Sequence, residues 1–500
     1  MRFTHAGGRL LQMMITIRNI IERIGGTVVP GSFEYSDSDC IDNVVTDTRL
    51  LSEGGDYSHT AFIAVKGEFF DGNDFIGPAA RAGVFFIVAG ADMEKARRAV
   101  LQGKKTVIVC CEDTLKAYGR IAGIRRDMLD FCAIGVTGSV GKTTAKEFVF
   151  KAVSALGKAA KTPKNFNNEV GVPKTVLSIE KDVKYAVIEM GMRGRGQIRF
   201  LSEVVRPHVG IITNIGTAHL EILGSMENTR LAKLEIADFM DENDFLLVNG
   251  DDALLSEAWD VLDENGKENI PGIITFGFSE GCYFRAKNVL VTASATEFDL
   301  EIGGIFVKRV SLGVVGEHFV YAALAAIGTA NVLGASSSDL LEKVIPEVSS
   351  VVPEDTGRQQ VYELPGGTLI DDCYNASPEA VRAELGILAR LAGRGHKTAF
   401  LGDMLELGDV SEAEHTGIGK VCDEYEVDTV VCVGKRAADI KNGAPEESKT
   451  LFVCYETSKE AAEHAAEFVK TGSTVLVKGS HAMNMGLISA RIKEIFENKN

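Results

Sequence analysis

The sequence predicts an α/β protein with mostly parallel sheets. Short continuous apolar runs, such as residues 185–188 and 209–213, alternate with helix-like stretches, and such runs are typical of strands buried on both faces of a parallel sheet. A second alternating series follows a stretch near residues 353–357 that contains proline and glycine. A length of 500 residues suggests two to four domains. We expect three domains, at about 1–112, 113–350 and 351–500.

The N-terminal region is expected to form the smaller α/β domain. Residues 15–24 have the helical spacing of apolar side chains, whereas residues 61–65 and 84–88 have the composition of strands. The helix-like stretch 112–130 leads into the central domain. We expect residues 1–12 to be disordered.

The central and third regions each predict a mostly parallel sheet. The central sheet is expected to carry an antiparallel appendage at 271–312, followed by a helix at 319–332 that ends at Gly334. In the third region, helices at 378–391 and 412–422 separate short apolar runs, as in a Rossmann-like α/β domain. Those runs are residues 368–370, 398–401, 429–433 and 474–477.

Composition and charge exclude several classes of protein. The net charge of −17 argues against a nucleic acid or an anionic membrane surface as a partner. The nine cysteines contain no CxxC pair and indicate reduced thiols in a cytoplasmic protein. No apolar run is long enough for a membrane span, and no secretory signal peptide is recognisable at the N terminus.

The most informative segment is the run at residues 136–144, which reads VTGSVGKTT between a predicted strand and a predicted helix. Backbone N–H groups in such a loop face a phosphate chain. Lys142 would reach the outer phosphates, and Thr143 would ligate Mg²⁺. Val136 stands where the general pattern has a glycine, yet the position between strand and helix favours a nucleotide site over a structural turn. The candidate contacts are Thr137, Gly138, Ser139, Val140, Gly141, Lys142, Thr143 and Thr144.

Three other side chains are candidates for a metal site beside this loop. Glu189 ends one apolar run and His219 follows another, and the carboxyl ends of parallel strands gather at one edge of a sheet. Carboxylate and hydroxyl oxygens suit Mg²⁺, whereas a histidine is a less usual ligand. Taken alone, His219 would more often be a hydrogen-bonded loop residue, and Lys233 would be one lysine on a solvated helix face.

An asparagine-rich segment at residues 165–173 is poor material for a regular element. It contains Asn165, Asn167 and Asn168, followed by Glu169. Side-chain amides both donate and accept hydrogen bonds. The segment is therefore a candidate loop for binding a polar ligand.

The order of these motifs resembles that of the Mur ligases, the ATP-dependent amide-forming enzymes of peptidoglycan synthesis. The phosphate loop has the family's form, including the missing first glycine, and residues 165–173 have the form found in members that add D-alanyl-D-alanine. The matching segments extend from about residue 44 to residue 485. The others are residues 47–49, 67–76, 189–191, 213–221, 232–236, 371–375, 402–408 and 478–480.

The resemblance implies a central P-loop ATPase domain and a reaction through an acyl phosphate. ATP would phosphorylate the terminal carboxylate of UDP-N-acetylmuramoyl-tripeptide, and the amine of D-alanyl-D-alanine would attack the product. Two Mg²⁺ ions and Lys142 would neutralise the phosphate charge. Thr143 and Glu189 would hold one ion, and His219 would lie near the second. In the family, the lysine that matches Lys233 is carbamylated, which converts it into an anion that can ligate or orient around Mg²⁺.

The resemblance also assigns binding roles outside the phosphate loop. Asn249 would contact adenine, Arg358 the nucleotide and Asp371 the ribose. The expected substrate-binding residues are Thr48, Arg49, Gly67, Asp71, Asn165, Asn167, Asn168, Glu169, Asn375 and Lys478. We expect the partners of the protein to be its small-molecule substrates, and we expect the protein to be a monomer.

Several positions depart from the family pattern. Phe319 and Ala322 replace two asparagines, so an adenine contact normally made by an amide could become aromatic stacking by Phe319. Ser377 replaces an asparagine, and His481 replaces an arginine. Two alternatives therefore stay open. One is a related ligase with another acceptor, such as D-alanyl-D-lactate, D-alanyl-D-serine or an amino acid. The other is a nucleotide-binding homologue with impaired catalysis.

Overall fold

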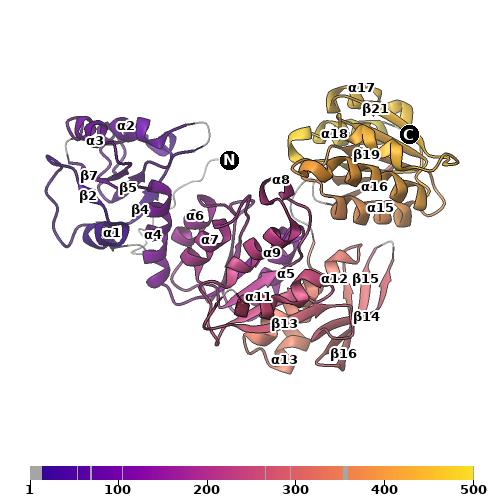
Figure 1. The fold of residues 1–500 in the computed structure, drawn as a ribbon, viewed down its shortest axis with the longest axis horizontal. Coiled ribbons are helices and arrows are strands. Elements are labelled where there is room, and N and C mark those ends of the chain that lie inside the picture. The colour runs from indigo at the N-terminus through magenta and orange to yellow at the C-terminus, as the bar shows by residue number, and fades with distance from the viewer. Residues whose placement is uncertain are drawn as a thin grey trace. The chain divides into compact units, whose positions relative to one another are not determined.

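The computed structural model describes residues 14–52, 54–67, 70–103, 105–264, 266–292, 294–352 and 359–498. Its elements confirm the α/β class with mostly parallel sheets (Figure 1). The chain divides into two compact units. The first comprises Met1–Gly135, Gly157–Met190 and Gln197–His208. The second comprises Val136–Leu156, Gly191–Gly196 and Val209–Asn500. The domain borders near residues 112 and 350 stay predictions.

The first unit contains a five-stranded sheet in the order β2-β7-β6-β5-β4. Its strands are β2 (Thr27–Val28), β4 (Asn43–Val45), β5 (Thr60–Ile63), β6 (Phe86–Ala89) and β7 (Val107–Cys110). All neighbours are parallel except β2 and β7. Alternate residues enter two cores, one with α1 (Ile17–Ile24) and α4 (Thr114–Asp127), the other with α2 (Ile76–Arg81) and α3 (Met93–Val100). Burial on both faces explains why β5, β6 and β7 are apolar throughout. A short antiparallel pair, β1 (Ile15–Thr16) with β3 (Cys40–Ile41), accompanies the sheet.

Three further strands begin in the first unit. They are β8 (Cys132–Thr137), β9 (Ala159–Lys161) and β10 (Tyr185–Glu189), in the order β8-β10-β9. Helix α4 packs against α6 (Gly171–Ser178) and α7 (Gln197–Val205). The last residues of β8 pass into the second unit and lead directly into the phosphate loop.

In the second unit, β11 (Val209–Ile212), β12 (Phe245–Asn249) and β13 (Gly272–Gly277) are parallel neighbours. The predicted antiparallel appendage is present in β14 (Phe284–Val291), β15 (Thr296–Ile302) and β16 (Ile305–Leu312). The expected first strand of this appendage, β13, is not antiparallel: it pairs in parallel with β12 and extends the parallel series. The predicted helix is α12 (His318–Val332), which packs on α5 (Lys142–Ser154).

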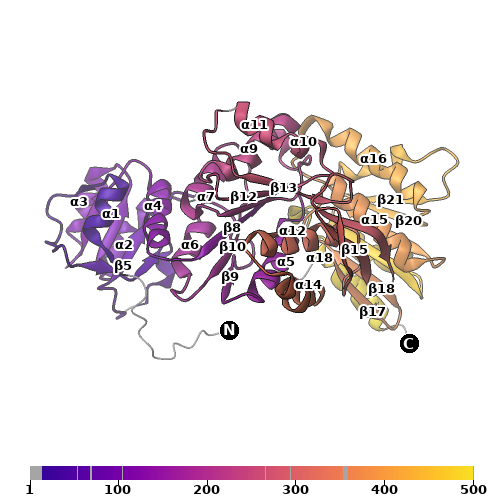
Figure 2. The same cartoon turned by 90° about the horizontal axis from the view of Figure 1, so that it is seen from below.

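The same unit contains a six-stranded sheet in the order β17-β18-β22-β19-β20-β21. Figure 2 labels its strands β17, β18, β20 and β21. Its strands are β17 (Gln360–Leu364), β18 (Gly367–Asp372), β19 (Lys397–Gly402), β20 (Thr429–Val433), β21 (Leu451–Tyr455) and β22 (Ser473–Lys478). Only β17 runs antiparallel to its neighbour. One face packs on α15 (Pro378–Ala392) and α16 (Ser411–Glu424), the other on α17 (Ser458–Phe468) and α18 (Gly486–Glu497). The sequence predicted the four inner strands but not the edge strands β17 and β21.

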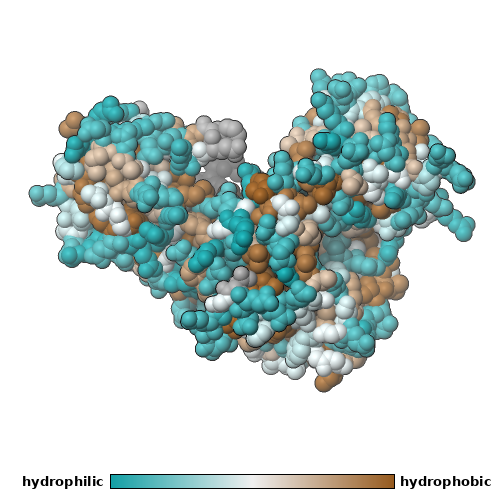
Figure 3. All heavy atoms as spheres, viewed as in Figure 1, coloured by the Kyte–Doolittle hydropathy of each residue, from teal (hydrophilic) through white to brown (hydrophobic). Residues whose placement is uncertain are grey.

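Hydrophilic side chains cover much of the face drawn in Figure 3, in keeping with the acidic composition. Within the described ranges, no helix combines the length and the apolar character needed to cross a bilayer.

Candidate active site

The phosphate loop joins β8 to α5 and depends on two glycines. Gly138 has φ 148° and Gly141 has φ 81°. A Cβ atom at Gly138 would lie 1.8 Å from Thr213 Oγ1, so this position has no room for a side chain. Lys142 Nζ donates to the carbonyls of Gly138, at 2.8 Å, and Ser139, at 3.1 Å. A main chain with positive φ at both glycines and a lysine amine over the loop fits a phosphate chain.

A second loop, which follows β11, holds the phosphate loop in place. Ser139 Oγ accepts from Gly216 N at 2.7 Å, and Asn214 Oδ1 accepts from Val140 N at 3.0 Å. Thr213 Oγ1 donates to Val140 O at 2.6 Å. Backbone groups of the phosphate loop are thus satisfied from residues 213–216, which preorganises the loop. The family resemblance includes these residues, but it did not predict this structural role.

Asn249 ends β12 and connects this second loop to the next turn. Its Nδ2 donates to Thr213 O at 3.1 Å, and its Oδ1 accepts from Asp251 N at 3.0 Å. Both ends of the amide therefore have protein partners, and only 8 % of the residue is exposed. An adenine contact by Asn249 stays a prediction.

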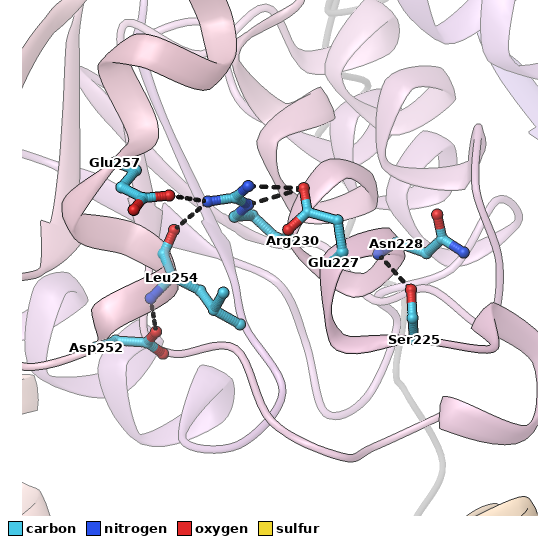
Figure 4. Close-up of polar contacts among 7 residues, drawn as sticks. All are labelled: Ser225, Glu227, Asn228, Arg230, Asp252, Leu254 and Glu257. Atoms are coloured by element: carbon cyan, nitrogen blue, oxygen red, sulfur yellow. Dashed lines mark hydrogen bonds and ion pairs between the residues drawn. The ribbon is translucent and has the colours of Figure 1, made fainter.

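Helix α9 (Met226–Leu234) carries Lys233 and is fixed at both ends of its first turn (Figure 4). Ser225 Oγ caps the helix by accepting from Asn228 N at 3.1 Å. The Arg230 guanidinium lies between two carboxylates, 2.7 Å from Glu227 Oε1 and 2.8 Å from Glu257 Oε2. Because Arg230 lies one turn before Lys233 on the same helix, these contacts hold the helix backbone from which the Lys233 side chain extends.

Lys233 is a buried lysine with 1 % of its surface exposed. Burial lowers its pKa well below the ordinary value, and the positive charge of Lys142 lowers this pKa further. Helical spacing alone would place Lys233 on a solvated helix face, whereas the family resemblance makes it a carbamylated residue near Mg²⁺. The structure buries the amine of Lys233 within electrostatic range of the phosphate-loop lysine, and its place beside a metal stays a prediction.

The side chains of His219 and Glu406 are in contact inside the second unit. His219 Nδ1 lies 2.5 Å from Glu406 Oε2. Both residues have the left-handed backbone conformation, with φ 62° and φ 66°. The hydrogen bond with His219 lowers the pKa of the Glu406 carboxyl. The role of His219 beside a second metal stays a prediction, because in this arrangement its Nδ1 contacts a carboxylate.

Two adjacent aspartates at the end of β18 point to different partners. Asp371 accepts from Ser489 Oγ at 2.9 Å and lies 3.3 Å from Lys493 Nζ. Asp372 instead pairs with Lys478, whose Nζ also donates to Asn375 O at 3.0 Å. The structure therefore brings the predicted residues Lys478 and Asn375 together. The Asp371 carboxylate is held by α18, and its ribose contact stays a prediction.

Helix α15 contributes two glutamates that the sequence analysis missed. Glu379 Oε1 accepts from Thr217 N at 3.3 Å and from Thr217 Oγ1 at 3.2 Å, next to the loop that supports the phosphate site. Glu384 is 4 % exposed, and its Oε2 has no hydrogen-bond partner among the described residues. Burial, and then the negative charge of Asp372, raise the pKa of Glu384 well above its usual value, while Lys478 opposes the shift. Helical periodicity could have found Glu384, because it shares a face with the buried residues Val381 and Leu388.

We expect Glu384→Gln to stabilise the protein at alkaline pH. A carboxyl whose pKa is raised on folding contributes its stability below the unfolded pKa, near 4.3, and loses it as pH rises through the folded pKa. Glutamine stays neutral, so the variant should gain melting temperature over the parent at pH 8 and little at pH 4. Thermal melts across that range, with the exposed Glu412→Gln on α16 as control, measure the difference. Equal pH profiles for parent and Glu384→Gln would contradict the assignment.

In the first unit, the asparagine-rich loop surrounds the end of β10. Asn167 Nδ2 donates to Glu189 Oε1 at 2.8 Å, and Glu189 N donates to Thr162 Oγ1 at 2.9 Å. Asn168 Oδ1 accepts from Gly171 N at 2.8 Å and so holds the start of α6. The loop thus orients the carboxylate predicted to bind metal, which residue spacing did not indicate.

The rest of this loop is tied down by local contacts. Glu169 Oε1 accepts from Gln197 Nε2 at 2.5 Å, and Asn165 O accepts from Asn167 N at 2.8 Å. Both residues therefore help to shape the loop. A direct contact with substrate stays a prediction for each.

The predicted uridine-nucleotide residues lie in two turns of the first unit. Thr48 and Arg49 lie in a single 3-10 turn capped by Asp47. Arg49 Nη2 lies 2.7 Å from Asp47 Oδ2 although the arginine side chain is 89 % exposed. Hydrogen bonds from Arg49 lower the pKa of Asp47. An exposed guanidinium held only by its neighbour can exchange partners, which suits ligand binding.

The other turn contains Gly67 and Asp71. Gly67 N donates to Phe70 O at 2.9 Å. Asp71 Oδ1 accepts from Asn73 N at 2.9 Å and from Asn73 Nδ2 at 2.8 Å. Asn73 Oδ1 in turn accepts from Gly90 N at 2.7 Å, which joins this turn to the end of β6.

The positions that depart from the family pattern have structural partners. Phe319 is 4 % exposed and stacks on Phe148 with ring centroids 6.0 Å apart, so its ring fills the core between α12 and α5. Ala322 is buried in the same helix. Ser377 caps α15, and His481 lies 5.4 Å from the Tyr374 ring. Stacking of Phe319 on adenine stays a prediction. Arg358 lies outside the described residues.

The donor set fits Mg²⁺ only as part of a nucleotide complex. In the described part of the chain, no three histidine, cysteine, aspartate or glutamate side chains gather to hold a metal. Mg²⁺ commonly uses one or two protein ligands together with water and substrate phosphates. Thr143 in the second unit and Glu189 in the first unit each provide an oxygen of that kind, and each is buried. Thr137 and Thr144 flank the loop, at the end of β8 and in the first turn of α5.

Comparison with known proteins defines the class to which this site belongs. The Mur ligase middle domain matches residues 136–330, and the Mur ligase glutamate ligase domain matches residues 357–481. The chain is 32 % identical to a relative from Bacillus subtilis (strain 168), over 96 % of this chain and 98 % of the relative. The chain therefore belongs to the Mur ligase family, a family of ATP-dependent ligases, which confirms the resemblance.

The relatives share one printed name. The Bacillus subtilis protein is UDP-N-acetylmuramoyl-tripeptide–D-alanyl-D-alanine ligase. So is a protein of Escherichia coli (strain K12), which is 31 % identical over 91 % of this chain and 94 % of its own length. A crystal structure of MurF from Acinetobacter baumannii matches with a TM-score of 0.83 and 28 % identity, covering 97 % of this chain and 99 % of that one. MurF ligase from Thermotoga maritima, solved in complex with ADP, matches with a TM-score of 0.78 and 27 % identity over 92 % and 98 % of the two chains.

Proposed function

We propose that this chain is an ATP-dependent ligase that joins D-alanyl-D-alanine to UDP-N-acetylmuramoyl-tripeptide. The products are UDP-N-acetylmuramoyl-pentapeptide, ADP and phosphate, in the synthesis of peptidoglycan precursors. The observation that carries the proposal is similarity along almost the whole length of relatives with this activity in their name. The intact phosphate loop supports catalysis over the alternative of an impaired nucleotide-binding homologue.

In the proposed reaction, the residues of the protein bind the substrates and stabilise the charge that develops. Bound ATP supplies the phosphoryl group that activates the tripeptide carboxylate as an acyl phosphate. The phosphate-loop amides and Lys142 hold the phosphate chain and offset its developing charge. The Asn167–Glu189 contact orients a carboxylate at the end of β10. The attacking amine forms the new C–N bond as phosphate leaves with the oxygen it received from the carboxylate, and the amine gives up a proton.

We also propose that Mg²⁺ binds with the nucleotide, through Thr143 and Glu189, and that Lys233 is carbamylated. The lowered pKa of Lys233 supports carbamylation, because a neutral amine adds to CO₂ and releases a proton whereas an ammonium ion does not. The resulting anion would sit within electrostatic range of Lys142.

Incubation with ¹³C-bicarbonate is expected to label Lys233. A carbonyl resonance should appear in the parent protein and be absent from Lys233→Gln, which should also lose about 10²-fold or more of its ligase rate. Lys146 on α5 is a matched internal control, since it is equally buried, at 1 %, but lies 3.3 Å from Glu147 Oε1. A resonance that persists in Lys233→Gln and vanishes in Lys146→Gln would show that Lys146 carries the carbamate, and would contradict the proposal for Lys233.

Phosphate release from ATP tests the function directly. Purified protein, Mg²⁺ and the tripeptide substrate are assayed with and without D-alanyl-D-alanine, and the product is weighed by mass spectrometry. Release that needs both substrates and gives the pentapeptide supports the proposal. Release with D-alanyl-D-lactate, D-alanyl-D-serine or a free amino acid, but not with D-alanyl-D-alanine, would favour a related ligase. No release with either a lysine- or a diaminopimelate-containing tripeptide would favour a binding role.

A monomeric state and a cytoplasmic location stay predictions, as do the two domain borders. Light scattering of the purified protein measures the first. Limited proteolysis near residues 112 and 350, followed by mass analysis of the fragments, tests the borders.

A further inference from the structure

Two cysteines occupy paired positions on neighbouring strands of the six-stranded sheet. Cys432 on β20 and Cys454 on β21 are register partners in a parallel pair. Such partners point to the same face of a sheet, with backbones about 4.8 Å apart. A disulfide needs Cα atoms about 4.4–6.8 Å apart. The pair is therefore placed to form a disulfide with little movement of the backbone.

The two thiols differ in access. All nine cysteines lie in described parts of the chain, and Cys454 is the exposed one. It lies on β21, an edge strand of the sheet, so reagents can reach it from solution. Cys432 is fully buried in the core on the α15–α16 face. The pair thus combines a thiol that solutes can reach with a thiol that they cannot.

The two thiols also differ in acidity. The pKa of Cys454 is lowered to about 6, chiefly by a hydrogen bond from the Cys432 thiol; burial opposes this shift, and the positive charge of Lys441 adds to it. The same hydrogen bond, followed by burial, raises the pKa of Cys432. The groups that act on Cys454 are thus Cys432 from β20 and Lys441 from the 3-10 segment η6 (Ala437–Gly443). An exposed position near a positive charge is typical of reactive cysteines.

We propose that Cys454 and Cys432 form a redox-modification site that reacts with hydroperoxides. The Cys454 thiolate attacks one peroxide oxygen, the O–O bond breaks, and hydroxide or alkoxide leaves, which gives a sulfenic acid. The Cys432 thiol then attacks the Cys454 sulfur, an S–S bond forms, and water leaves. The two sulfurs together lose two electrons, and the peroxide gains them. A dithiol restores both thiols by exchange.

Peptide mapping after treatment with hydrogen peroxide tests the site independently of the ligase reaction. A Cys432–Cys454 crosslink within one chain, removed by dithiothreitol, is expected in the parent protein and in the control variant Cys132→Ser. Cys432→Ser should leave a sulfenic acid on Cys454 that dimedone traps, and Cys454→Ser should show neither crosslink nor trapping. A parent protein in which Cys454 proceeds to sulfinic acid without a crosslink, or in which other cysteines are trapped equally fast, would overturn the proposal.

Alkylation by iodoacetamide provides a second test that leaves both cysteines in place. The rate at Cys454 should rise as pH passes through about 6 and then level off, because the thiolate is the nucleophile. Lys441→Gln should move this midpoint upward and slow alkylation at pH 6. A rate that keeps rising through pH 8, in parent and variant alike, would remove the basis for Cys454 as the attacking thiol.

Discussion

Replacing Lys142 with alanine is expected to lower kcat for ligation by about 10³-fold, the scale seen when one preorganised charge-stabilising donor is removed. The Lys142 amine lies over the phosphate loop, 2.8 Å from Gly138 O and 3.1 Å from Ser139 O. It is therefore placed to meet the phosphate charge as it moves between oxygens. The tripeptide KM should change little, because the amine contacts the loop that binds phosphates. Steady-state phosphate release at saturating substrates measures both constants.

Lys151 offers a matched control on the same helix. Its Nζ lies 4.0 Å from Glu347 Oε2, its side chain is 38 % exposed, and exposed pairs of this kind contribute little. Lys151→Ala should keep kcat within about twofold of the parent, since such pairs contribute at most about 1 kcal/mol even to stability. If Lys142→Ala and Lys151→Ala had similar rates, the phosphate-loop assignment would be wrong.

Those features that are encoded locally could be predicted from the sequence. Gly138 and Gly141 have positive φ, a conformation that favours glycine. The two glycines between an apolar run and a helix-like stretch therefore indicated the loop. The inner strands β19, β20 and β22 are buried on both faces and consequently appear as continuous apolar runs. The class of fold and the family could be predicted because they too depend on local runs and motifs in the sequence.

Features that depend on tertiary contacts could not be predicted. Nothing near His219 in the sequence indicates that Glu406 lies 2.5 Å away. Phe319 is apolar and could stack on a base or fill a core, and only the packing of α12 on α5 places its ring against Phe148. The edge strand β21 is different, because its residues LFVCY form an apolar run like those of its neighbours and could have been found in the sequence, although the sheet leaves them exposed or half-buried. Helical spacing alone would put Lys233 on a solvated face, and only the folded structure shows that the lysine is buried.

The two glycines of the phosphate loop should respond very differently to alanine. Gly141→Ala meets no atom within 4 Å and suffers only the cost of a left-handed conformation, about 1–2 kcal/mol. Gly138→Ala suffers a comparable cost at φ 148° and also places its Cβ 1.8 Å from Thr213 Oγ1. Thr213 must then move and lose its bond to Val140 O, at about 1 kcal/mol, with a further 1–3 kcal/mol of overpacking. ADP affinity, measured by calorimetry, should therefore fall roughly 100-fold or more in Gly138→Ala, and clearly less in Gly141→Ala.

A double variant separates this steric cause from a general loss of folding. Thr213→Ala removes the atom that the new Cβ would meet at 1.8 Å, although Thr213 Cβ and N, at 3.0 and 3.1 Å, remain. Gly138→Ala should consequently cost less in the Thr213→Ala background than in the parent, by about 1 kcal/mol or more for directly contacting residues. Equal costs in the two backgrounds would place the damage in the backbone conformation of Gly138 alone. The contact between the two loops would then play no part in holding the phosphate site open.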